Sequence, residues 1–238
     1  MKTSGILTLV PTPLSEDGIL EPVAFARLNF AALEESDNSV FVIEDLKPGR
    51  RRWLHFGLPR QAVENFVLYN EHTCLEASKS LLSELQKGKN VFLMSDGGLP
   101  SFYDPGIELV KMCHQNKIKV TSTPFCNSVV LALALSGCSH KKFWFEGFLP
   151  LDSAQREQVI KKLLNQKETS VLMDTPYRLK RVLEEFQSAF AANSGIKRKL
   201  FVALDLNGAK EELHLGSPAE LLGRIIDFKR EFILIVSE

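Results

Sequence analysis

The 238-residue sequence has no excess of either charge, because 29 Lys and Arg residues balance 29 Asp and Glu residues. Proteins dedicated to nucleic acid usually carry a basic excess, so the balance leaves room only for a local basic patch. A long apolar run is also absent, and the apolar-rich segment 6–10 is too short for a signal peptide or a membrane span. We therefore expect a soluble, cytoplasmic protein with no membrane partner.

Cysteine is scarce and histidine is scattered. Cys74, Cys113, Cys126 and Cys138 form no C-x-x-C pair and have no histidine at zinc-ligand spacing. This pattern favours reduced, buried thiols over a disulfide or a metal role, and we expect no metal. None of the five histidines falls in a Ser-His-Asp order that would indicate a hydrolase.

The rest of the sequence is typical of a globular α/β protein. With 45% hydrophobic and 24% charged residues, the chain is long enough for two compact domains. Short apolar runs alternate with helical spacing, which favours two α/β domains with mostly parallel sheets. We place the domains at residues 1–122 and 123–238, on either side of the break at Thr123 and Pro124. The predicted strands are Ile6–Val10, Val40–Ile43, Val91–Met94, Ile118–Thr121, Val171–Met173, Leu200–Leu204 and Phe232–Val236.

The most informative segment is the loop from Ser95 to Gly106, which follows a predicted buried strand and precedes a predicted helix, Ile107–His114. Ligands of open parallel sheets bind beyond the carboxyl ends of strands, and paired glycines let a backbone approach a ligand closely. An alternative is a simple strand-to-helix turn, in which Asp104 is the helix N-cap and Pro105 the first helical residue.

This loop resembles the pattern S-D-A-G-x-P-x-x-x-D-P-G of the ribosomal RNA ribose methyltransferases in the tetrapyrrole methylase class. Further segments resemble that family's motifs in the same order, so the resemblance spans nearly the whole chain. They are Leu9–Leu14, Glu44–Lys47 with Trp53–Gly57, Asn70–His72, Phe145–Pro150 and Asp174–Leu179. The S-D-x-G loop follows the ribosomal RNA branch rather than the G-D-P form of the corrinoid and porphyrin methylases.

The resemblance implies a tetrapyrrole methylase-like fold with S-adenosylmethionine in a cleft between the two domains, and a homodimer. The donor-binding residues that it implies in the first domain are Pro11, Ser95, Asp96, Gly97, Gly98, Leu99, Phe102 and Tyr103. Those that it implies in the second domain are Asn127, Ser128, Met173, Asp174, Thr175, Leu206 and Asn207.

The sequence departs from the family pattern where an acceptor would be chosen. Pro124–Ser128 replaces P-G-x-S-A, so that Phe125 stands where the family has glycine, and Asp205–Gly208 replaces E-L-T-K. Asp45–Lys47 replaces D-T-R, which exchanges a guanidinium fork for a point charge. The chain also ends at the last predicted strand, without the C-terminal segment expected from the family. The donor site is therefore indicated more strongly than the RNA substrate.

A hydroxyl acceptor must lose a proton during methyl transfer, which calls for a nearby base. Our candidates for the catalytic base are Glu44 and Asp45, and our candidates for substrate binding are Lys47, Arg50 and Arg178. The alternative for the two acids is a strand-end turn with solvated charges. The runs Arg50–Arg52 and Lys197–Lys199 can meet RNA phosphates, but such runs are more often solvated faces.

We therefore expect an S-adenosylmethionine-dependent methyltransferase, with the 2′-hydroxyl of a ribosomal RNA ribose as one candidate acceptor. Another RNA or a small molecule remains open as the acceptor. A second alternative is a non-catalytic ligand-binding or interaction module on the same fold, which the altered residues Phe125, Cys126, Asn207 and Gly208 favour.

Overall fold

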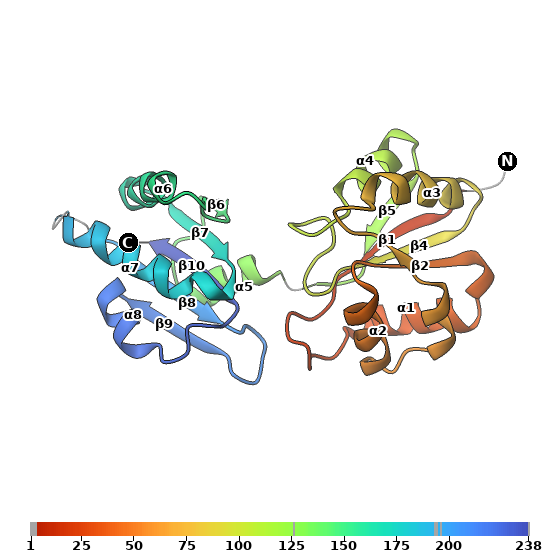
Figure 1. Ribbon diagram of the computed structural model, residues 1–238, viewed down its shortest axis with the longest axis horizontal. Helices are drawn as coiled ribbons and strands as arrows, with labels where there is room; N and C mark the ends of the chain where they lie inside the picture. Colours follow the sequence, from red (N-terminus) through yellow and green to blue (C-terminus); the bar gives the residue numbers. More distant parts are fainter. Residues whose placement is uncertain (1–3, 126, 193–194, 196, 238) are drawn as a thin grey trace. The chain divides into compact units, whose positions relative to one another are not determined.

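The chain divides into two compact units, residues 1–125 and 126–238. The computed structural model describes residues 4–125, 127–192, 195 and 197–237 (Figure 1). Thr123 lies with the first unit, because its backbone N–H donates to the carbonyl of Leu9 at 3.1 Å. The division therefore falls a few residues after the boundary expected from the sequence.

The first unit is built around a five-stranded sheet in the order β3-β2-β4-β1-β5, with every neighbouring pair parallel. Its strands are β1 (Ile6–Val10), β2 (Ser39–Ile43), β3 (Val67–Leu68), β4 (Asn90–Met94) and β5 (Lys119–Ser122). Its helices are α1 (Pro22–Leu33), α2 (Leu46–His55), α3 (Cys74–Gln86) and α4 (Ile107–Gln115), with short 3-10 turns at Ser36–Asn38 and Arg60–Asn65.

Each face of this sheet carries its own buried cluster, because side chains alternate across a strand. Phe92 and Met94 of β4 pack with α1 and α2, whereas Val91 and Leu93 of the same strand pack with α3 and α4. Figure 1 shows the two helix pairs on opposite faces of the sheet. A parallel sheet covered on both faces explains why these strands read as continuous apolar runs.

The second unit contains a mixed five-stranded sheet in the order β6-β7-β10-β8-β9. Its strands are β6 (Phe143–Gly147), β7 (Thr169–Asp174), β8 (Lys199–Leu204), β9 (Glu212–Gly216) and β10 (Phe232–Ser237). Only β6 and β7 pair in parallel, and the other three pairings are antiparallel. The expected α/β class is confirmed, but the mostly parallel arrangement holds for the first sheet and not for the second.

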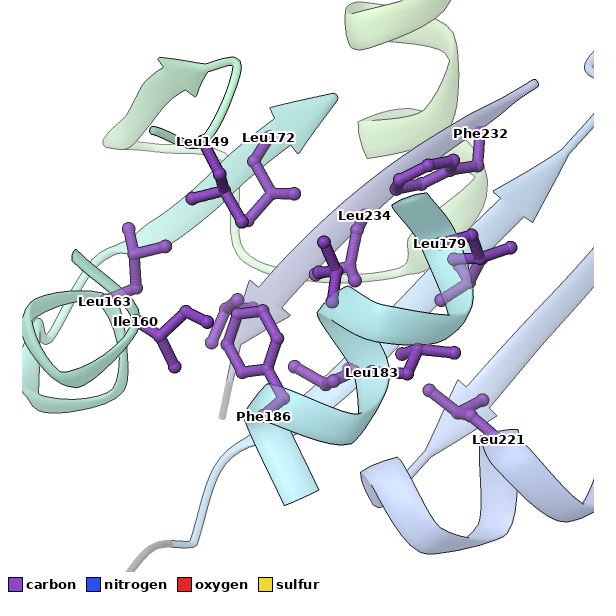
Figure 2. Close-up of a cluster of buried hydrophobic side chains, with 14 of the residues drawn as sticks. Leu149, Ile160, Leu163, Leu172, Leu179, Leu183, Phe186, Leu221, Phe232 and Leu234 are labelled. Atoms are coloured by element: carbon purple, nitrogen blue, oxygen red, sulfur yellow. The ribbon is translucent and has the colours of Figure 1, made fainter. Parts of the chain in front are cut away.

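Four helices cover the second sheet: α5 (Ser128–Ser136), α6 (Ser153–Asn165), α7 (Leu179–Ala192) and α8 (Pro218–Arg224). A 3-10 turn at Pro176–Arg178 leads into α7. Phe186 and Leu183 of α7 pack with Leu234 of β10 in the larger cluster, together with residues of α6 and α8 (Figure 2). On the other face, α5 packs Val129 and Leu133 against the sheet.

Cys74, Cys113 and Cys138 are free thiols, and Cys113 is buried in the core of the first unit. Cys126 lies outside the described residues. No helix in the described part of the chain is both long and apolar enough to cross a membrane.

Candidate functional site

The first unit gathers several polar residues at one edge of its sheet. All of its strands are parallel, so the residues that follow their carboxyl ends lie at the same edge, where open α/β sheets bind ligands. Pro11 follows β1, Glu44 and Asp45 follow β2, and Ser95 and Asp96 follow β4. The sequence-predicted residues of this unit are thus brought together around one strand-end edge.

Backbone pairing joins the turn after β1 to the glycine loop after β4. The N–H of Thr12 donates to the carbonyl of Gly98 at 2.9 Å, and the N–H of Gly98 donates back at 3.0 Å. The hydroxyl of Thr12 donates to the carbonyl of Ser95 at 3.0 Å, and the hydroxyl of Ser95 donates to the carbonyl of Gly98 at 3.1 Å. The first three bonds fix the loop against the Pro11 turn, and the fourth closes the loop on itself.

Two glycines in the loop are required by the backbone. Gly98 has a φ of 101°, and Gly106 has a φ of 147°, values that residues with a side chain rarely adopt. A Cβ on Gly106 would also lie 2.9 Å from the hydroxyl oxygen of Ser101. A Cβ on Gly97 would meet only the carbonyl oxygens of Pro13 and Leu14, at 3.7 and 3.8 Å, which is ordinary contact.

Asp104 does not cap the following helix. Helix α4 begins at Ile107, its N-cap is Gly106, and no side chain caps it. The alternative in which Asp104 is the N-cap is therefore wrong, because the backbone turns at Gly106 two residues later. Asp104 belongs instead to a group of acids at the strand ends, a role that the sequence reasoning missed.

That group, here called the acidic cluster, consists of Glu44, Asp45, Asp96 and Asp104. A carboxylate oxygen of Glu44 accepts from the N–H of Asp96 at 3.3 Å. Burial, together with the charges of Glu44 and Asp45, raises the pKa of Asp96 to about 6. Burial and the charge of Glu44 likewise raise the pKa of Asp104 to about 7. Asp96 and Asp104 therefore keep their protons to a higher pH than exposed carboxylates do.

The two acids predicted to be catalytic differ in their surroundings. Asp45 is the N-cap of α2, and its side chain accepts from the N–H of Lys47 at 3.1 Å. Glu44 is half-buried, and its carboxylate is turned to the amide of Asp96. Asp45 is exposed, as the alternative of a solvated strand-end charge expects, whereas Glu44 is partly removed from water.

The basic run that follows the acids is not one solvated face. Arg50 is exposed, and Arg51 pairs with Glu16 at 2.6 Å on the surface. Arg52 is only 5% exposed and donates to the carbonyls of Pro13 and Ser15, which tie the turn after β1 to α2. Its guanidinium also lies 5.7 Å from the centre of the Phe56 ring. The solvated-face interpretation is thus wrong for Arg52, whose burial lowers its pKa from the ordinary value.

Two aromatic residues stand on the outer part of the glycine loop. Phe102 and Tyr103 pack edge to face with ring centres 5.3 Å apart, and both are exposed. Leu99, another predicted donor contact, lies three residues before Phe102 and is half-buried. The loop thus presents an apolar surface next to the acidic cluster.

The predicted residues of the second unit also share an edge of their sheet. Phe232 of β10 pairs with both Asp174 of β7 and Leu204 of β8, so the carboxyl ends of these two strands lie at the same edge. Met173, Asp174 and Thr175 stand at the end of β7, and Leu206 and Asn207 follow β8. Leu206 is buried in the cluster beneath α5, whereas Asn207 is exposed with a φ of 61°.

A buried carboxylate marks the end of β7. Asp174 is 4% exposed, and one of its oxygens accepts from the N–H of Thr175 at 2.8 Å and from Arg178 at 3.0 Å. Burial outweighs Arg178 and raises the pKa of Asp174. Arg178 also donates to the carbonyls of Leu149 and Pro150, so this predicted substrate residue supports the loop after β6.

Asn127 and Ser128 stand at the start of α5, as expected. Asn127 is the N-cap, and its side-chain oxygen accepts from the N–H groups of Val129 and Val130 at 3.0 and 3.3 Å. The amides at this helix start give it a partial positive charge that suits a carboxylate ligand.

The buried carboxylate oxygens suit the hydrogen-bond donors of a nucleoside that carries an amino acid. In the described part of the chain, no three His, Cys, Asp or Glu side chains are grouped to hold a metal. One carboxylate oxygen of Asp96 and one of Asp174 are buried without a hydrogen-bond partner among the described residues. Such oxygens need donors, which ammonium and ribose hydroxyl groups supply.

The fold defines a class of two-unit α/β proteins. The structure matches a diphthine synthase with a TM-score of 0.66 at 12% identity, covering 98% of this chain and 90% of that one. It also matches a cobalt precorrin-4 methyltransferase of cobalamin biosynthesis with a TM-score of 0.59 at 13% identity, covering 98% and 94%. At these identities the matches show the fold alone.

The family follows from the sequence. The model of the Tetrapyrrole (Corrin/Porphyrin) Methylases matches residues 25–196, well over half of the chain. The protein therefore belongs to this family and is a methyltransferase, which confirms the predicted resemblance; methyltransferases of this family use S-adenosylmethionine.

Curated relatives match almost the full length. The ribosomal RNA small subunit methyltransferase I of Synechocystis sp. is 31% identical over 235 residues, covering 98% of this chain and 79% of the relative. The protein of the same name from Halalkalibacterium halodurans is 32% identical over 234 residues, covering 98% and 75%.

Proposed function

We propose that this protein transfers a methyl group from S-adenosylmethionine to the 2′-hydroxyl of a ribose in small-subunit ribosomal RNA. The names of its relatives, at 31–32% identity over 98% of the chain, support the acceptor. The observation that carries the site is the glycine loop fixed by backbone pairing to the Pro11 turn, beside a buried carboxylate oxygen of Asp96 that has no described partner.

In this proposal, each unit contributes strand-end residues to donor binding. Its sulfonium supplies an activated methyl group, so the protein chiefly has to orient donor and acceptor. Asp96 accepts from a donor hydroxyl or ammonium group, and the glycine loop with Pro11, Leu99, Phe102 and Tyr103 lies against the apolar parts. The contributions of the second unit are the start of α5 at Asn127 and Ser128, and the ends of β7 and β8 at Met173–Thr175 and Leu206–Asn207.

The acidic cluster handles the proton of the acceptor hydroxyl. One oxygen of Glu44 is occupied by the amide of Asp96, which leaves Oε1 to take the proton. Asp45 caps α2 and keeps the start of that helix in place beside Glu44. Lys47, Arg50 and Arg178 orient the negative groups of the acceptor.

The protein acts as a cytoplasmic homodimer in this proposal, as the resemblance implies. Sedimentation equilibrium at micromolar concentration is then expected to give twice the chain mass of 26.7 kDa. A mass of one chain at that concentration contradicts the dimer and leaves the chemistry untouched.

The decisive experiment incubates the protein with methyl-labelled S-adenosylmethionine and either small ribosomal subunits or a small-molecule extract, each from a deletion strain. Label is expected in the small-subunit RNA, at a nucleotide whose 3′ phosphodiester bond resists alkaline hydrolysis. Label in the small-molecule fraction contradicts the acceptor. If neither label nor calorimetric donor binding is detected, the result favours the non-catalytic module.

Glu44→Gln and Asp45→Asn test the acids, with donor binding measured in parallel. If Glu44 takes the proton, Glu44→Gln slows turnover by about 100-fold or more, the usual size of a general-base effect, and leaves donor affinity unchanged. Turnover equal to that of the wild type removes Glu44 from the mechanism.

A further inference from the structure

A hollow of about 380 Å³ lies in the second unit at the edge of the sheet opposite to Asp174. Its lining includes Lys141 and Lys142, which precede β6, Lys167, which precedes β7, and the hydroxyl residues Thr169 and Ser237. Thr169 begins β7, whereas Asp174 ends it, so the hollow and the predicted donor-binding edge are separated by the length of the strand. At about 3.3 Å per residue this length is roughly 20 Å.

A second basic segment reaches the same edge. Lys199 begins β8 and pairs in register with Ser237 of the hollow. The neighbouring Arg198 is 8% exposed, and it donates to the carbonyl of Glu168, another lining residue, at 2.7 Å and to that of Val236 at 3.2 Å. The run Lys197–Lys199 is therefore not a solvated face throughout, because its central guanidinium holds two strands together.

The result is a concentrated positive surface on a chain whose net charge is zero. We call it the basic edge, consisting of the exposed residues Lys141, Lys142, Lys167, Lys197 and Lys199. Among the described residues, none of the salt bridges includes Lys141, Lys142 or Lys167. In the part of the chain that the structure describes, the acids nearby are Glu168 in the lining and Glu220, which faces Lys199 and caps α8. Positive charge therefore exceeds negative charge at this edge.

We propose that the basic edge binds the phosphate backbone of the RNA acceptor. Ammonium groups supply charge to phosphates, and hydroxyl groups such as those of Thr169 and Ser237 supply hydrogen bonds. Together they position RNA without reading its sequence. The inference rests on the proposed function and deepens it, because an acceptor that reaches both edges of this sheet is a polynucleotide rather than a small molecule.

The test is the salt dependence of RNA binding. The triple variant Lys141→Gln, Lys142→Gln, Lys167→Gln keeps side-chain length and removes three charges. Its matched control is Lys79→Gln, Lys111→Gln, Lys119→Gln, three exposed lysines of the first unit. A fluorescently labelled single-stranded RNA oligonucleotide is titrated with each full-length protein at several salt concentrations, and calorimetry measures donor binding.

We expect the triple variant to bind RNA about ten-fold more weakly at low salt, with the slope of log affinity against log salt reduced by about 2, since each phosphate contact on a single strand contributes about 0.7. The control variant should match the wild type, and donor affinity should be unchanged in both.

The proposal is overturned if the triple variant binds RNA as tightly as the wild type, or if the control variant loses as much RNA affinity as the triple variant. So does binding of the edge to phosphatidylserine vesicles with no binding to RNA. If the wild type fails to bind the methyl donor while the RNA result stands, the proposed function fails and the basic edge survives.

Discussion

Neighbouring charged residues at the strand ends of the first unit have different roles because their burial differs. Arg51 makes a surface pair with Glu16, whereas Arg52 is buried and supports a turn. Asp45 caps a helix, whereas Asp96 and Asp104 have raised pKa values because they are partly removed from water. Residue type predicted that charge would gather here, but which charge is buried depends on packing that the sequence does not show.

The two adjacent glycines of the loop should respond differently to a methyl group. Gly97→Ala meets only ordinary contacts, so we expect a change in unfolding free energy within about 0.5 kcal/mol. Gly98→Ala places a side chain at a φ of 101°, and we expect a loss of about 1–3 kcal/mol. Chemical denaturation of both variants measures the difference, and equal stability contradicts the assigned backbone. The larger Gly97→Val should keep the fold and lose donor binding in calorimetry.

Asp104→Asn should change how stability depends on pH. The pKa of Asp104 is raised from 3.8 to about 7, so the folded protein holds a proton that the unfolded chain releases between about pH 4 and 7. Folding is therefore progressively disfavoured by this group as pH rises through that window. An amide cannot ionise, so the variant should gain stability relative to the wild type from pH 4 to 8, on the order of 1 kcal/mol because the site is partly screened.

Melting temperatures across that pH range provide the measurement. The groups that face Asp104 and Asp96 are Glu44, Asp45 and Arg52, and none of them is altered in this variant. Asp37→Asn, at an exposed carboxylate on a 3-10 turn, is the control and should run parallel to the wild type. If melting temperature depends on pH in the same way for Asp104→Asn and the wild type, the raised pKa of Asp104 does not contribute to stability.

Elements with strong apolar signals were predictable, and weakly buried ones were not. All seven predicted strands are strands, and six of them are runs of apolar residues in a sheet covered by helices. The seventh, β5, is a partly exposed edge strand that lies one residue later than predicted. Three strands were not predicted, each for its own reason. Strand β3 has only two residues, and β6 begins with exposed Phe143 and Trp144. The edge strand β9 has exposed Leu213 and Leu215 between polar residues. The edge strands β6 and β9 lack the uninterrupted burial that makes a strand visible in sequence.

Helix α2 and the turn after β1 are joined by Arg52, which suggests a matched pair of variants. Arg52→Gln removes charged donors from two carbonyls, so we expect a loss of about 2 kcal/mol in unfolding free energy. Arg51→Gln removes an exposed pair and should cost less than about 0.5 kcal/mol. Chemical denaturation compares the two.

Donor affinity provides a second readout for the same pair. Because the supported turn pairs with Gly98, Arg52→Gln should also weaken donor binding, while Arg51→Gln should not. Similar stabilities for the two variants would mean that burial of Arg52 does not matter to the turn.

At the scale of the whole chain, the family and the approximate position of the strand-end residues followed from motifs, since loops after buried strands can be located in sequence. The mixed order of the second sheet did not follow, because β10 is the last strand in sequence but pairs between β7 and β8. Asp104 was missed for a similar reason: its neighbours Glu44 and Asp96 are set by strand order, not by sequence distance.

Each described core cluster draws its residues from one unit, which predicts that damage to one core stays local. Phe186→Ala removes a fully buried ring from the larger cluster of the second unit and should cost about 3–5 kcal/mol there. Hydrogen exchange should then accelerate in β7, β8 and β10, while β1, β2 and β4 keep their protection, because opening is confined to the unit whose packing is lost. Ser188→Ala, at an exposed position of the same helix, is the control. Faster exchange in both sheets would show that the two units unfold as one cooperative body.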